Sequence, residues 1–383
     1  STSGFDTFQI TSTGGFSAPT NTFGVAAQNG NFLAATSFEI NGATFVYGSQ
    51  SDDDGVIGYR LQADGTLGVL GQDQIENADQ ANDARDFQTT TIDSRDYMFI
   101  PSQSDNSISS YWVKQNGVAK FQAKVGVEQN LGIAVPSHLE LVEIAGETFL
   151  LMASAGSSSV TVLRVLEDGN MIVTDHIIDE LTTRFQSTSV FETVTVDDRV
   201  FVIAGGGDDG LTLMEMMPNG TLLHHDTIAD QLNTSLGSVS GLDVFVSGGD
   251  LQIYAGGEQD TGVTQFTVDL GTLGDSIVGT TASETLNGTA QADVIFGDSG
   301  DDALQGNAGN DILVDGSGND IMTGGNGADI FALSSDKQHD TIMDFELGVD
   351  RLDLSNYELL RDLGHINGEA HADGAPLTFF SAT

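Results

Sequence analysis

Acidic side chains recur every nine residues in the last third of this chain. From residue 279 to residue 332 the sequence divides into six nonapeptides in unbroken register: GTTASETLN, GTAQADVIF, GDSGDDALQ, GNAGNDILV, DGSGNDIMT and GGNGADIFA. The sixth position of each copy carries a carboxylate, and the eighth is always apolar. Carboxylates and carbonyls are the hard oxygen ligands that Ca²⁺ prefers. A ladder of them therefore predicts several bound calcium ions.

The spacing also predicts the elements that hold these carboxylates. Glycine-rich hexads adopt turns that other residues disfavour, and the remaining three residues form a short strand with one side chain inward. Two such repeats make one turn of a parallel β-roll, so residue i lies over residue i+18. The position-six residues then form two columns on opposite edges, Asp293, Asp311 and Asp329 on one and Glu284, Asp302 and Asp320 on the other. A disordered linker is disfavoured, because disorder does not keep an apolar position in phase.

The nonapeptides resemble the RTX (repeats-in-toxin, haemolysin-type) calcium-binding repeats. Residues 340–345 (DTIMDF) and 348–354 (GVDRLDL) resemble the segment that follows the roll in serralysin-type secreted proteases. The resemblance implies that each ion lies between two loops one turn apart, which give positions two, four and six and positions one, three and five. The loop pairs would be Asp298, Gly300 and Asp302 with Asp315, Ser317 and Asn319; Asn307, Gly309 and Asp311 with Gly324, Asn326 and Ala328; and Thr289, Gln291 and Asp293 with Gly306, Ala308 and Asn310.

Twenty residues in and after the repeats are the candidate calcium ligands. They are Glu284, Asp293, Asp298, Gly300, Asp301, Asp302, Asn307, Gly309, Asn310, Asp311, Asp315, Gly316, Gly318, Asn319, Asp320, Gly325, Gly327, Asp329, Asp340 and Asp344. Three features depart from the RTX pattern. The first copy has Thr280, Ala282 and Glu284, Asp315 replaces a glycine at position one, and Ala292 and Ala328 lack a side-chain oxygen at position five.

The charge balance excludes some partners. The chain of 383 residues has 56 acidic and 12 basic residues, a net charge of −44, and no cysteine. Nucleic acid and anionic membranes attract positive charge, so neither is an expected partner. No apolar run has transmembrane length. The first residues lack the pattern of a secretory signal, and the RTX resemblance implies export by a type I route with an uncleaved C-terminal signal, into surroundings where calcium is millimolar.

A longer repeat precedes the nonapeptides. Five apolar runs are spaced 51 to 52 residues apart: Phe45–Gly48, Tyr97–Ile100, Phe149–Met152, Val200–Ile203 and Leu251–Tyr254. Alternating runs with Asp-Gly or Asn-Gly turns surround them and indicate hairpins. Four short strands per unit predict an all-β chain with a β-propeller of five blades, or six, rather than a β-solenoid. We expect the propeller at 1–274, the β-roll at 275–354 and a cap or secretion-signal region at 355–383.

The units resemble lactonase-like and YVTN-type propellers, most clearly over residues 158–169 (SSVTVLRVLEDG). We expect the residue 5–10 strand to complete the last blade. In such folds the middle hairpin tips and the connectors share one face, here acidic. The tips are 52–55, 104–106, 156–158, 208–210 and 259–261, and the connectors add Asp73, Glu76, Asp79, Asp83, Asp86, Glu128, His138, Asp179, Glu180 and Asp230. These residues are either cation ligands or ordinary turn residues.

Two functions remain open at this stage. One is a secreted or cell-surface calcium-binding protein whose propeller is an interaction or structural module, with itself or a cation-bridged cell-surface or polysaccharide partner. The alternative is a metal-dependent extracellular hydrolase or lyase, lactonase-like or acting on polysaccharide. The sequence has no H-E-x-x-H and no G-x-S-x-G motif, so it identifies no catalytic residue.

Overall fold

The computed structural model is an all-β protein, as predicted. It describes residues 6–7, 20–21, 32–50, 55–70, 75–76, 82–129, 131–188, 190–334, 336, 338–354 and 377–380. The predicted tip at 52–54, the connector residues Asp73 and Asp79 and most of the tail from 355 onward lie outside these residues. In the part that the structure describes, no helix has the length and apolar character needed to cross a membrane.

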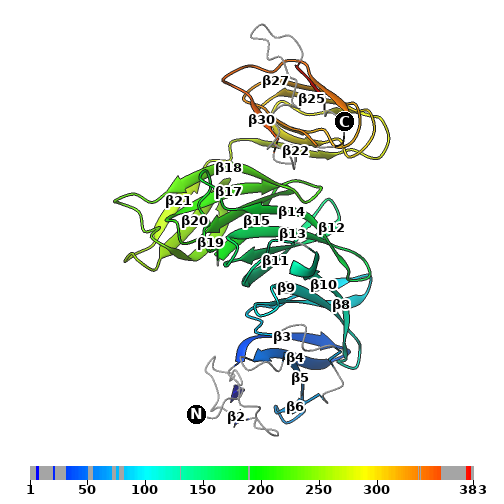
Figure 1. Ribbon diagram of the computed structural model, residues 1–383, viewed down its shortest axis with the longest axis vertical. Helices are drawn as coiled ribbons and strands as arrows, with labels where there is room; N and C mark the ends of the chain where they lie inside the picture. Colours follow the sequence, from blue (N-terminus) through cyan, green and yellow to red (C-terminus); the bar gives the residue numbers. More distant parts are fainter. Residues whose placement is uncertain are drawn as a thin grey trace.

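Five antiparallel sheets follow one another along the chain (Figure 1), which confirms the propeller-like units. Sheet 1 contains β3 (Phe32–Ile40), β4 (Ala43–Gln50), β5 (Val56–Leu61) and β6 (Leu67–Val69). Sheet 2 contains β7 (Gln88–Ile92), β8 (Arg95–Ser102), β9 (Ser107–Val113) and β10 (Ala119–Gly126), followed by the 3-10 helix η3 (Val127–Gln129). Sheet 3 contains β11 (Pro136–Ile144), β12 (Glu147–Ser154), β13 (Ser159–Val165) and β14 (Met171–Ile178). Sheet 4 contains β15 (Val190–Val196), β16 (Arg199–Gly205), β17 (Gly210–Met216) and β18 (Leu222–Ala229), and sheet 5 contains β19 (Val239–Ser247), β20 (Asp250–Gly257) and β21 (Thr264–Val268).

Successive sheets pack face to face through apolar cores. Among the described residues four such cores join sheet 1 to sheet 2, sheet 2 to sheet 3, sheet 3 to sheet 4, and sheet 4 to sheet 5. None of these four joins sheet 1 to sheet 5. Hairpin glycines help to set the contact. Gly117 has φ +80° and lies so close to the Phe45 ring of sheet 1 that a Cβ would be 2.3 Å from it. One repeat later, Gly169 lies on Tyr97 in the same way. The turn therefore needs glycine for both its backbone angle and its packing.

The N-terminal strand was predicted wrongly. In the described residues β1 (Asp6–Thr7) pairs with β2 (Thr20–Asn21), and sheet 5 has three strands. The chain leaves sheet 5 and enters β22 (Leu273–Val278), which pairs in parallel with β24 (Ala292–Phe296). The expected fourth strand of the last unit thus begins the next part of the fold, where its backbone groups find their partners.

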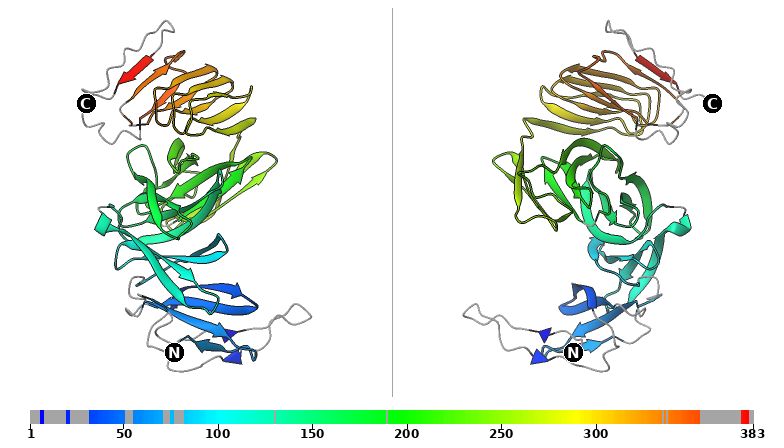
Figure 2. Two further views of the ribbon diagram at one scale, coloured as in Figure 1. Left: turned by 90° about the vertical axis from the view of Figure 1, so that its right-hand side faces the viewer. Right: turned by 60° about the vertical axis from the view of Figure 1, so that its left-hand side comes forward.

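The nonapeptides fold into a parallel β-roll with two sheets. One contains β22, β24, β26 (Ile312–Val314), β28 (Ile330–Ala332) and β30 (Arg351–Asp353). The other contains β23 (Thr285–Asn287), β25 (Ala303–Ala308), β27 (Ile321–Asn326), β29 (His339–Ile342) and β31 (Leu377–Phe380), the last of which pairs antiparallel with β29 at the end of the stack (Figure 2). Strands pair at the predicted spacing of 18, as in Leu304 with Met322. The position-eight side chains fill the core between the sheets, and those from Ile295 to Phe331 are 0% exposed.

The first roll sheet packs against sheet 4 of the propeller (Figure 1). Met217 and Leu223 of sheet 4 share an apolar core with roll residues that include Phe296 and Val314. A second group of contacts is polar, since Arg351 of the roll donates a 2.7 Å hydrogen bond to the carbonyl of His224. The roll and the fourth sheet therefore share one buried interface.

A buried ion pair lies at this interface. Arg199 donates to both carboxylate oxygens of Glu215, at 2.6 and 2.8 Å, and its remaining terminal nitrogen donates to the carbonyl of Ala292 in the roll at 2.8 Å. Glu215 also accepts from His225 at 2.7 Å. Burial opposes the charge of Glu215, yet the hydrogen bonds from His225 and Arg199 lower its pKa. Arg199 therefore joins the propeller to the roll through a single guanidinium.

We predict that Arg199→Met destabilises the protein by about 3–5 kcal/mol, because it leaves the Glu215 carboxylate buried without its main partner. The measurement is denaturant unfolding in calcium. The double variant Arg199→Met/Glu215→Met should recover much of the loss, since it removes both charges, and Lys120→Met on an exposed site is the control. A loss below about 1 kcal/mol in the single variant would contradict a structural role for the pair.

Candidate metal centre

Glycine at position four allows the turns of the roll to stack closely. Gly300, Gly309, Gly318 and Gly327 have φ between +121° and +151°. A Cβ on Gly318 would lie 1.7 Å from the carbonyl oxygen of Gly300 one turn earlier. Other residues would therefore be strained in the backbone and would also clash. The loops come close enough for the oxygens of adjacent turns to meet.

The position-six carboxylates form two hydrogen-bonded columns along the edges of the roll. In one column the amide of Asp293 donates to Asp311 Oδ1 at 2.8 Å, and the amide of Asp311 donates to Asp329 Oδ1 at 2.9 Å. In the other, the amide of Asp302 donates to Asp320 Oδ1 at 2.8 Å. These carboxylates are at most 2% exposed. One oxygen of each carboxylate thus orders the stack and leaves the second oxygen for another partner.

The second oxygens are the feature that a cation would satisfy. Oδ2 of Asp302, Asp311, Asp315 and Asp320 is buried and has no hydrogen-bond partner. A buried carboxylate oxygen without a partner is costly, and like charges within one stack repel each other. Calcium takes several oxygen ligands from carboxylates and carbonyls. The stacked loops offer both kinds, so the residues present fit the ion.

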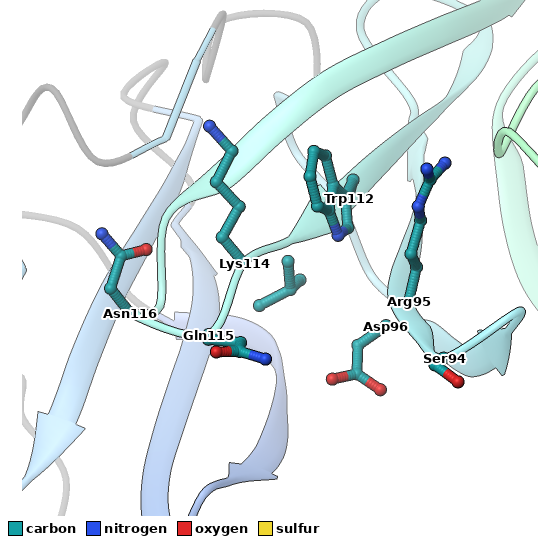
Figure 3. Close-up of a pocket in the computed structure, with 8 residues that line it drawn as sticks. Ser94, Arg95, Asp96, Trp112, Lys114, Gln115 and Asn116 are labelled. Atoms are coloured by element: carbon teal, nitrogen blue, oxygen red, sulfur yellow. The ribbon is translucent and has the colours of Figure 1, made fainter.

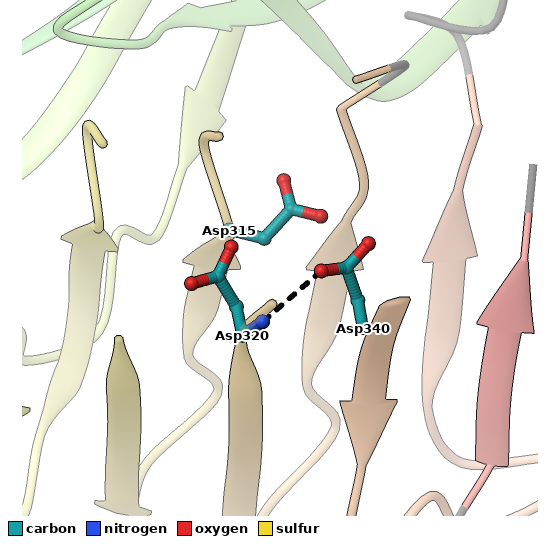
Figure 4. Close-up of side chains that lie close together, drawn as sticks. All are labelled: Asp315, Asp320 and Asp340. Atoms are coloured by element: carbon teal, nitrogen blue, oxygen red, sulfur yellow. Dashed lines mark hydrogen bonds between the residues drawn. The ribbon is translucent and has the colours of Figure 1, made fainter. Parts of the chain in front are cut away.

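Three buried carboxylates converge at one point of the second column. Asp315, Asp320 and Asp340 each place an oxygen within 4.8 Å of the others (Figure 4). Asp340 Oδ1 accepts from the amide of Asp320 at 3.1 Å, and Asp315 Oδ1 accepts from the amides of Gly316 at 2.6 Å and Ser334 at 2.8 Å. All three side chains are 1% exposed. Two oxygens in this group, Asp315 Oδ2 and Asp320 Oδ2, remain unpaired.

Burial raises the pKa of these carboxyl groups in the ion-free protein. The pKa of Asp320 is raised to about 7, first by burial and then by Asp340 and Asp302. Burial likewise raises the pKa values of Asp311, Asp329 and Asp340 to about 6. Burial and the neighbouring Asp340 carboxylate raise the pKa of Asp315 well above its usual range. A bound divalent cation would reverse this preference for the protonated form.

Position-five side chains form a separate, exposed row. Asp301 Oδ1 accepts from the amide of Asn319 at 2.9 Å, Asn310 Oδ1 accepts from the amide of Ala328 at 2.9 Å, and Asn319 Oδ1 accepts from the amide of His339 at 3.2 Å. These side chains bond one turn to the next. Their side-chain oxygens are therefore engaged outside the buried columns.

Several other predicted ligands have partners of their own. Asp344 accepts from the amides of Gly324 and Gly325 through its two oxygens, at 2.9 and 2.8 Å. Glu284 accepts from the amide of Thr280 at 2.6 Å, and Asn307 donates to the carbonyl of Gly288 at 2.9 Å. Of the remaining predicted residues, Asp298 and Gly316 lie in loops between the strands.

The loop of Asp315 stacks on the loop of Asp298 and Asp302, since the amide of Ser317 donates to the carbonyl of Asp298 at 2.9 Å. The Asp315 carboxylate itself lies close to those of Asp320 and Asp340. Sequence reasoning also missed the two ends of the first column. The amide of Asp275, whose side chain is exposed, donates to Asp293 Oδ1 at 2.6 Å, and Asp350 Oδ1 accepts from the amide of Asp329 at 3.0 Å. Asp275 lies 18 residues before Asp293, so the repeat contained the signal for it.

A family model describes the same stretch. The model of the RTX calcium-binding nonapeptide repeat matches residues 278–313 and 305–336. These residues are RTX calcium-binding repeats. No curated protein matches the chain. The match to the family model implies that the roll binds calcium.

Solved structures with some likeness were also found. A putative 6-phosphogluconolactonase from Bacteroides fragilis has 14% identity, covers 70% of this chain and 79% of its own, and has a TM-score of 0.45. A subunit of the mannuronan C5-epimerase from Azotobacter vinelandii has 38% identity, covers 23% of this chain and 54% of its own, and has a TM-score of 0.20. A Lactobacillus plantarum protein has 16% identity, covers 59% of this chain and 67% of its own, and has a TM-score of 0.38.

Several hairpin tips of the propeller fasten neighbouring sheets together. Asn106 Oδ1 accepts from the amide of Val135 at 2.8 Å, and one repeat later Ser158 Oγ accepts from the amide of Ser187 at 2.9 Å. In the next unit Asp209 Oδ1 accepts from the amide of Ser238, 29 residues later, at 2.8 Å. In all three units the donating amide lies 29 residues after the polar tip residue, so the contact between sheets accounts for these polar side chains.

Asp86, from the connector before β7, converges with His138 and Glu140 of β11. Nδ1 of His138 lies 3.1 Å from Asp86 Oδ2, and its ring meets Phe191 edge-on with centroids 5.0 Å apart. Burial lowers the pKa of His138, but the hydrogen bond and charge of Asp86 outweigh it and raise that pKa. Burial and the nearby Glu192 raise the pKa of Glu140 to about 7, and Glu140 Oε2 is buried without a hydrogen-bond partner. The sequence analysis placed His138 on a connector, whereas in the structure it lies on β11.

We predict that the calcium-free RTX roll loses stability as pH rises from about 4 to about 7. The raised pKa values mean that the folded roll binds more protons than the unfolded chain within this window, and above about 7 the effect is constant. Circular dichroism melts in chelator at several pH values measure it. Asp320→Asn should flatten part of the slope, whereas Asp301→Asn, which changes an exposed carboxylate, should leave it unchanged. A flat profile in the unsubstituted protein would contradict the prediction.

Proposed function

We propose that this chain is an exported, calcium-loaded protein whose propeller is an interaction or structural module. The observation that carries the proposal is the set of buried, unpartnered carboxylate oxygens in the RTX roll. Such a roll repels itself where calcium is scarce and folds where calcium is millimolar, the range of extracellular calcium modules. Export before folding, followed by folding outside, is consistent with this dependence and with a chain that has no cysteine.

The proposed calcium ligands are the position-six carboxylates together with Asp315, Asp340 and the loop carbonyls. We propose three units: a propeller at 1–274, the roll at 275–354 and a C-terminal region at 355–383 that closes the roll. Support for the last comes from β31, which pairs along β29. Pairing at this edge covers backbone groups that would otherwise be open to another chain.

The net negative charge of the chain favours a binding partner that is bridged to it by cations. With 56 acidic residues against 12 basic ones, two copies or a copy and an acidic glycan repel each other at low ionic strength. Calcium bound between carboxylates removes this repulsion and bridges the two surfaces. We therefore propose self-association, or attachment to a cell surface or matrix polysaccharide, through cations.

We predict that calcium folds the roll and that the fold depends on the columns. The change is Asp302→Ala with Asp311→Ala, which removes one carboxylate from each column, and it should raise the calcium concentration needed for folding by at least about tenfold, as expected when a charged ligand is lost. Circular dichroism and light scattering during a calcium titration measure folding and assembly.

The matched control for this experiment is Asp168→Ala with Asp269→Ala, two exposed carboxylates on propeller turns. It should leave the folding midpoint unchanged. An unchanged midpoint in the Asp302/Asp311 variant would overturn the ligand assignment. A calcium-loaded protein that stays monomeric at every concentration and binds no glycan would overturn the interaction function.

A second function is favoured by the Asp86–His138 pair with Glu140. A histidine oriented by a carboxylate beside a carboxyl group whose pKa is about 7 is an arrangement that supports general acid–base catalysis. We propose as the alternative an extracellular hydrolase or lyase that acts on a sugar lactone or a polysaccharide, with these residues on the propeller.

We predict that such an activity, if present, falls by at least about 10²-fold in His138→Gln, because general acid–base groups contribute factors of that size. Hydrolysis of a sugar lactone and cleavage of acidic polysaccharides are the assays, and His176→Gln is the control because His176 bonds Thr161 away from this group. Turnover that survives His138→Gln, or no turnover of any of these substrates, would overturn the alternative.

A further inference from the structure

One end of sheet 2 gathers the single tryptophan of the chain and several of its few cations. Trp112 lies between Arg95 and Lys114 (Figure 3), with the guanidinium carbon 5.4 Å and the ammonium nitrogen 5.5 Å from the ring centroid. The ring is also packed against the core between sheets 2 and 3, which fixes its position. A pocket of about 380 Å³ opens here, lined by Ser94, Arg95, Asp96, Trp112, Val113, Lys114, Gln115 and Asn116.

A third cation shares this face. Lys120 is exposed and lies directly opposite Trp112 on the neighbouring strand. Residues directly opposite each other in an antiparallel pair project to the same face of the sheet. Residues 85–124 contain five of the twelve Lys and Arg residues and only four acidic residues, in a chain whose net charge is −44. Arg95, Lys114 and Lys120 therefore gather at this end of sheet 2 in an otherwise acidic chain.

The repeat supplies an internal comparison, because the equivalent end of sheet 4 is covered by the roll. Glu215 lies opposite Phe201 and Leu223 there, as Trp112 lies opposite Tyr97 and Lys120 in sheet 2. Leu223 packs against the roll in an apolar core. The residue of sheet 2 that corresponds to Leu223 is Lys120.

The same contrast holds at the hairpin turns. Met217 begins the turn of sheet 4 with a hydrogen bond to the carbonyl of Thr221, and Lys114 begins that of sheet 2 with a bond to Val118, both at 2.8 Å. Met217 also packs in the apolar core with the roll. An apolar surface that binds the protein's own roll is thus replaced in sheet 2 by an aromatic and cationic one, which fits a ligand of different chemistry.

We propose that this pocket binds a carboxylated sugar, such as a uronate residue of an acidic glycan. One of the two flanking cations, Arg95 or Lys114, pairs with the sugar carboxylate and the other with a hydroxyl group, while the exposed edge of the Trp112 indole offers an apolar surface to the ring. Asp96, Gln115 and Asn116 supply acceptors and donors for hydroxyl groups. A long, uniformly charged polyanion such as nucleic acid would extend from the pocket over the acidic remainder of the surface, which disfavours it. This site needs no calcium and is separate from the RTX roll.

The single tryptophan makes the test direct. Tetragalacturonate is titrated into the full chain in calcium while Trp112 fluorescence is recorded, with the fully methyl-esterified tetrasaccharide as the uncharged probe. We expect a saturable change with the acid and none with the ester. Arg95→Gln/Lys114→Gln should weaken binding by about tenfold or more, as expected when charged hydrogen bonds are lost.

Lys124→Gln is the matched control, because its ammonium group lies 3.4 Å from Asp105 at the other end of the sheet, and it should bind as the unsubstituted protein does. Equal binding of the acid and the ester overturns the proposal. So does binding that survives in the double variant but disappears in chelator, because the glycan then lies on the calcium sites. Equal binding of an acetylated tetrapeptide with a free C-terminal carboxylate would overturn the assignment to a sugar.

Discussion

Close stacking of the turns in the roll brings buried aspartates of like charge near one another. Asp293, Asp302, Asp311, Asp320 and Asp329 are all buried within two columns, and each uses one oxygen to hold the backbone of the preceding turn. Hydrogen bonds alone leave the second oxygens of Asp302, Asp311 and Asp320 without partners. A protein interior tolerates this arrangement when the carboxyls are protonated or when a cation lies between them. The fold of the RTX roll and its binding of calcium are thus one property.

Arg199 of the propeller contacts the roll next to one of its charged columns. Its guanidinium bonds Glu215 within sheet 4 and the carbonyl of Ala292, the residue before a column carboxylate. Burial raises the pKa of Asp311 in that column, and the positive charge of Arg199 opposes this rise. Arg199 is therefore a permanent cation at the edge of the roll that faces the propeller. Arg199 and the apolar core around Met217 and Leu223 together form the interface between the propeller and the roll.

Polar residues of the propeller help to fix how its sheets stack. Tips such as Asn106 and Asp209 hold the next sheet, so their side chains are explained by the stacking of sheets. Both the Asp86–His138 pair and the Trp112 pocket also contact a neighbouring sheet. Asp86 accepts from the amide of Leu139 in sheet 3 at 2.8 Å, the His138 ring meets Phe191 of sheet 4, and Trp112 packs against the core between sheets 2 and 3. They lie on sheets whose spacing is set by apolar cores and by glycine turns, and this rigid support is what gives a few polar groups a fixed geometry.

The sequence by itself determined the periodic features of this protein. A nine-residue register fixes which side chains point inward and which carboxylates stack, since each strand repeats after 18 residues, and a 52-residue register fixes the four-stranded sheets. Contacts between parts without a common period were decided by the tertiary structure. Nothing in the repeat places Arg199 against Ala292, turns Asp315 toward Asp340, or takes the strand after Leu270 out of sheet 5 and into the roll. Local patterns specify neighbours at a fixed spacing, whereas these contacts depend on how two separately ordered stacks meet.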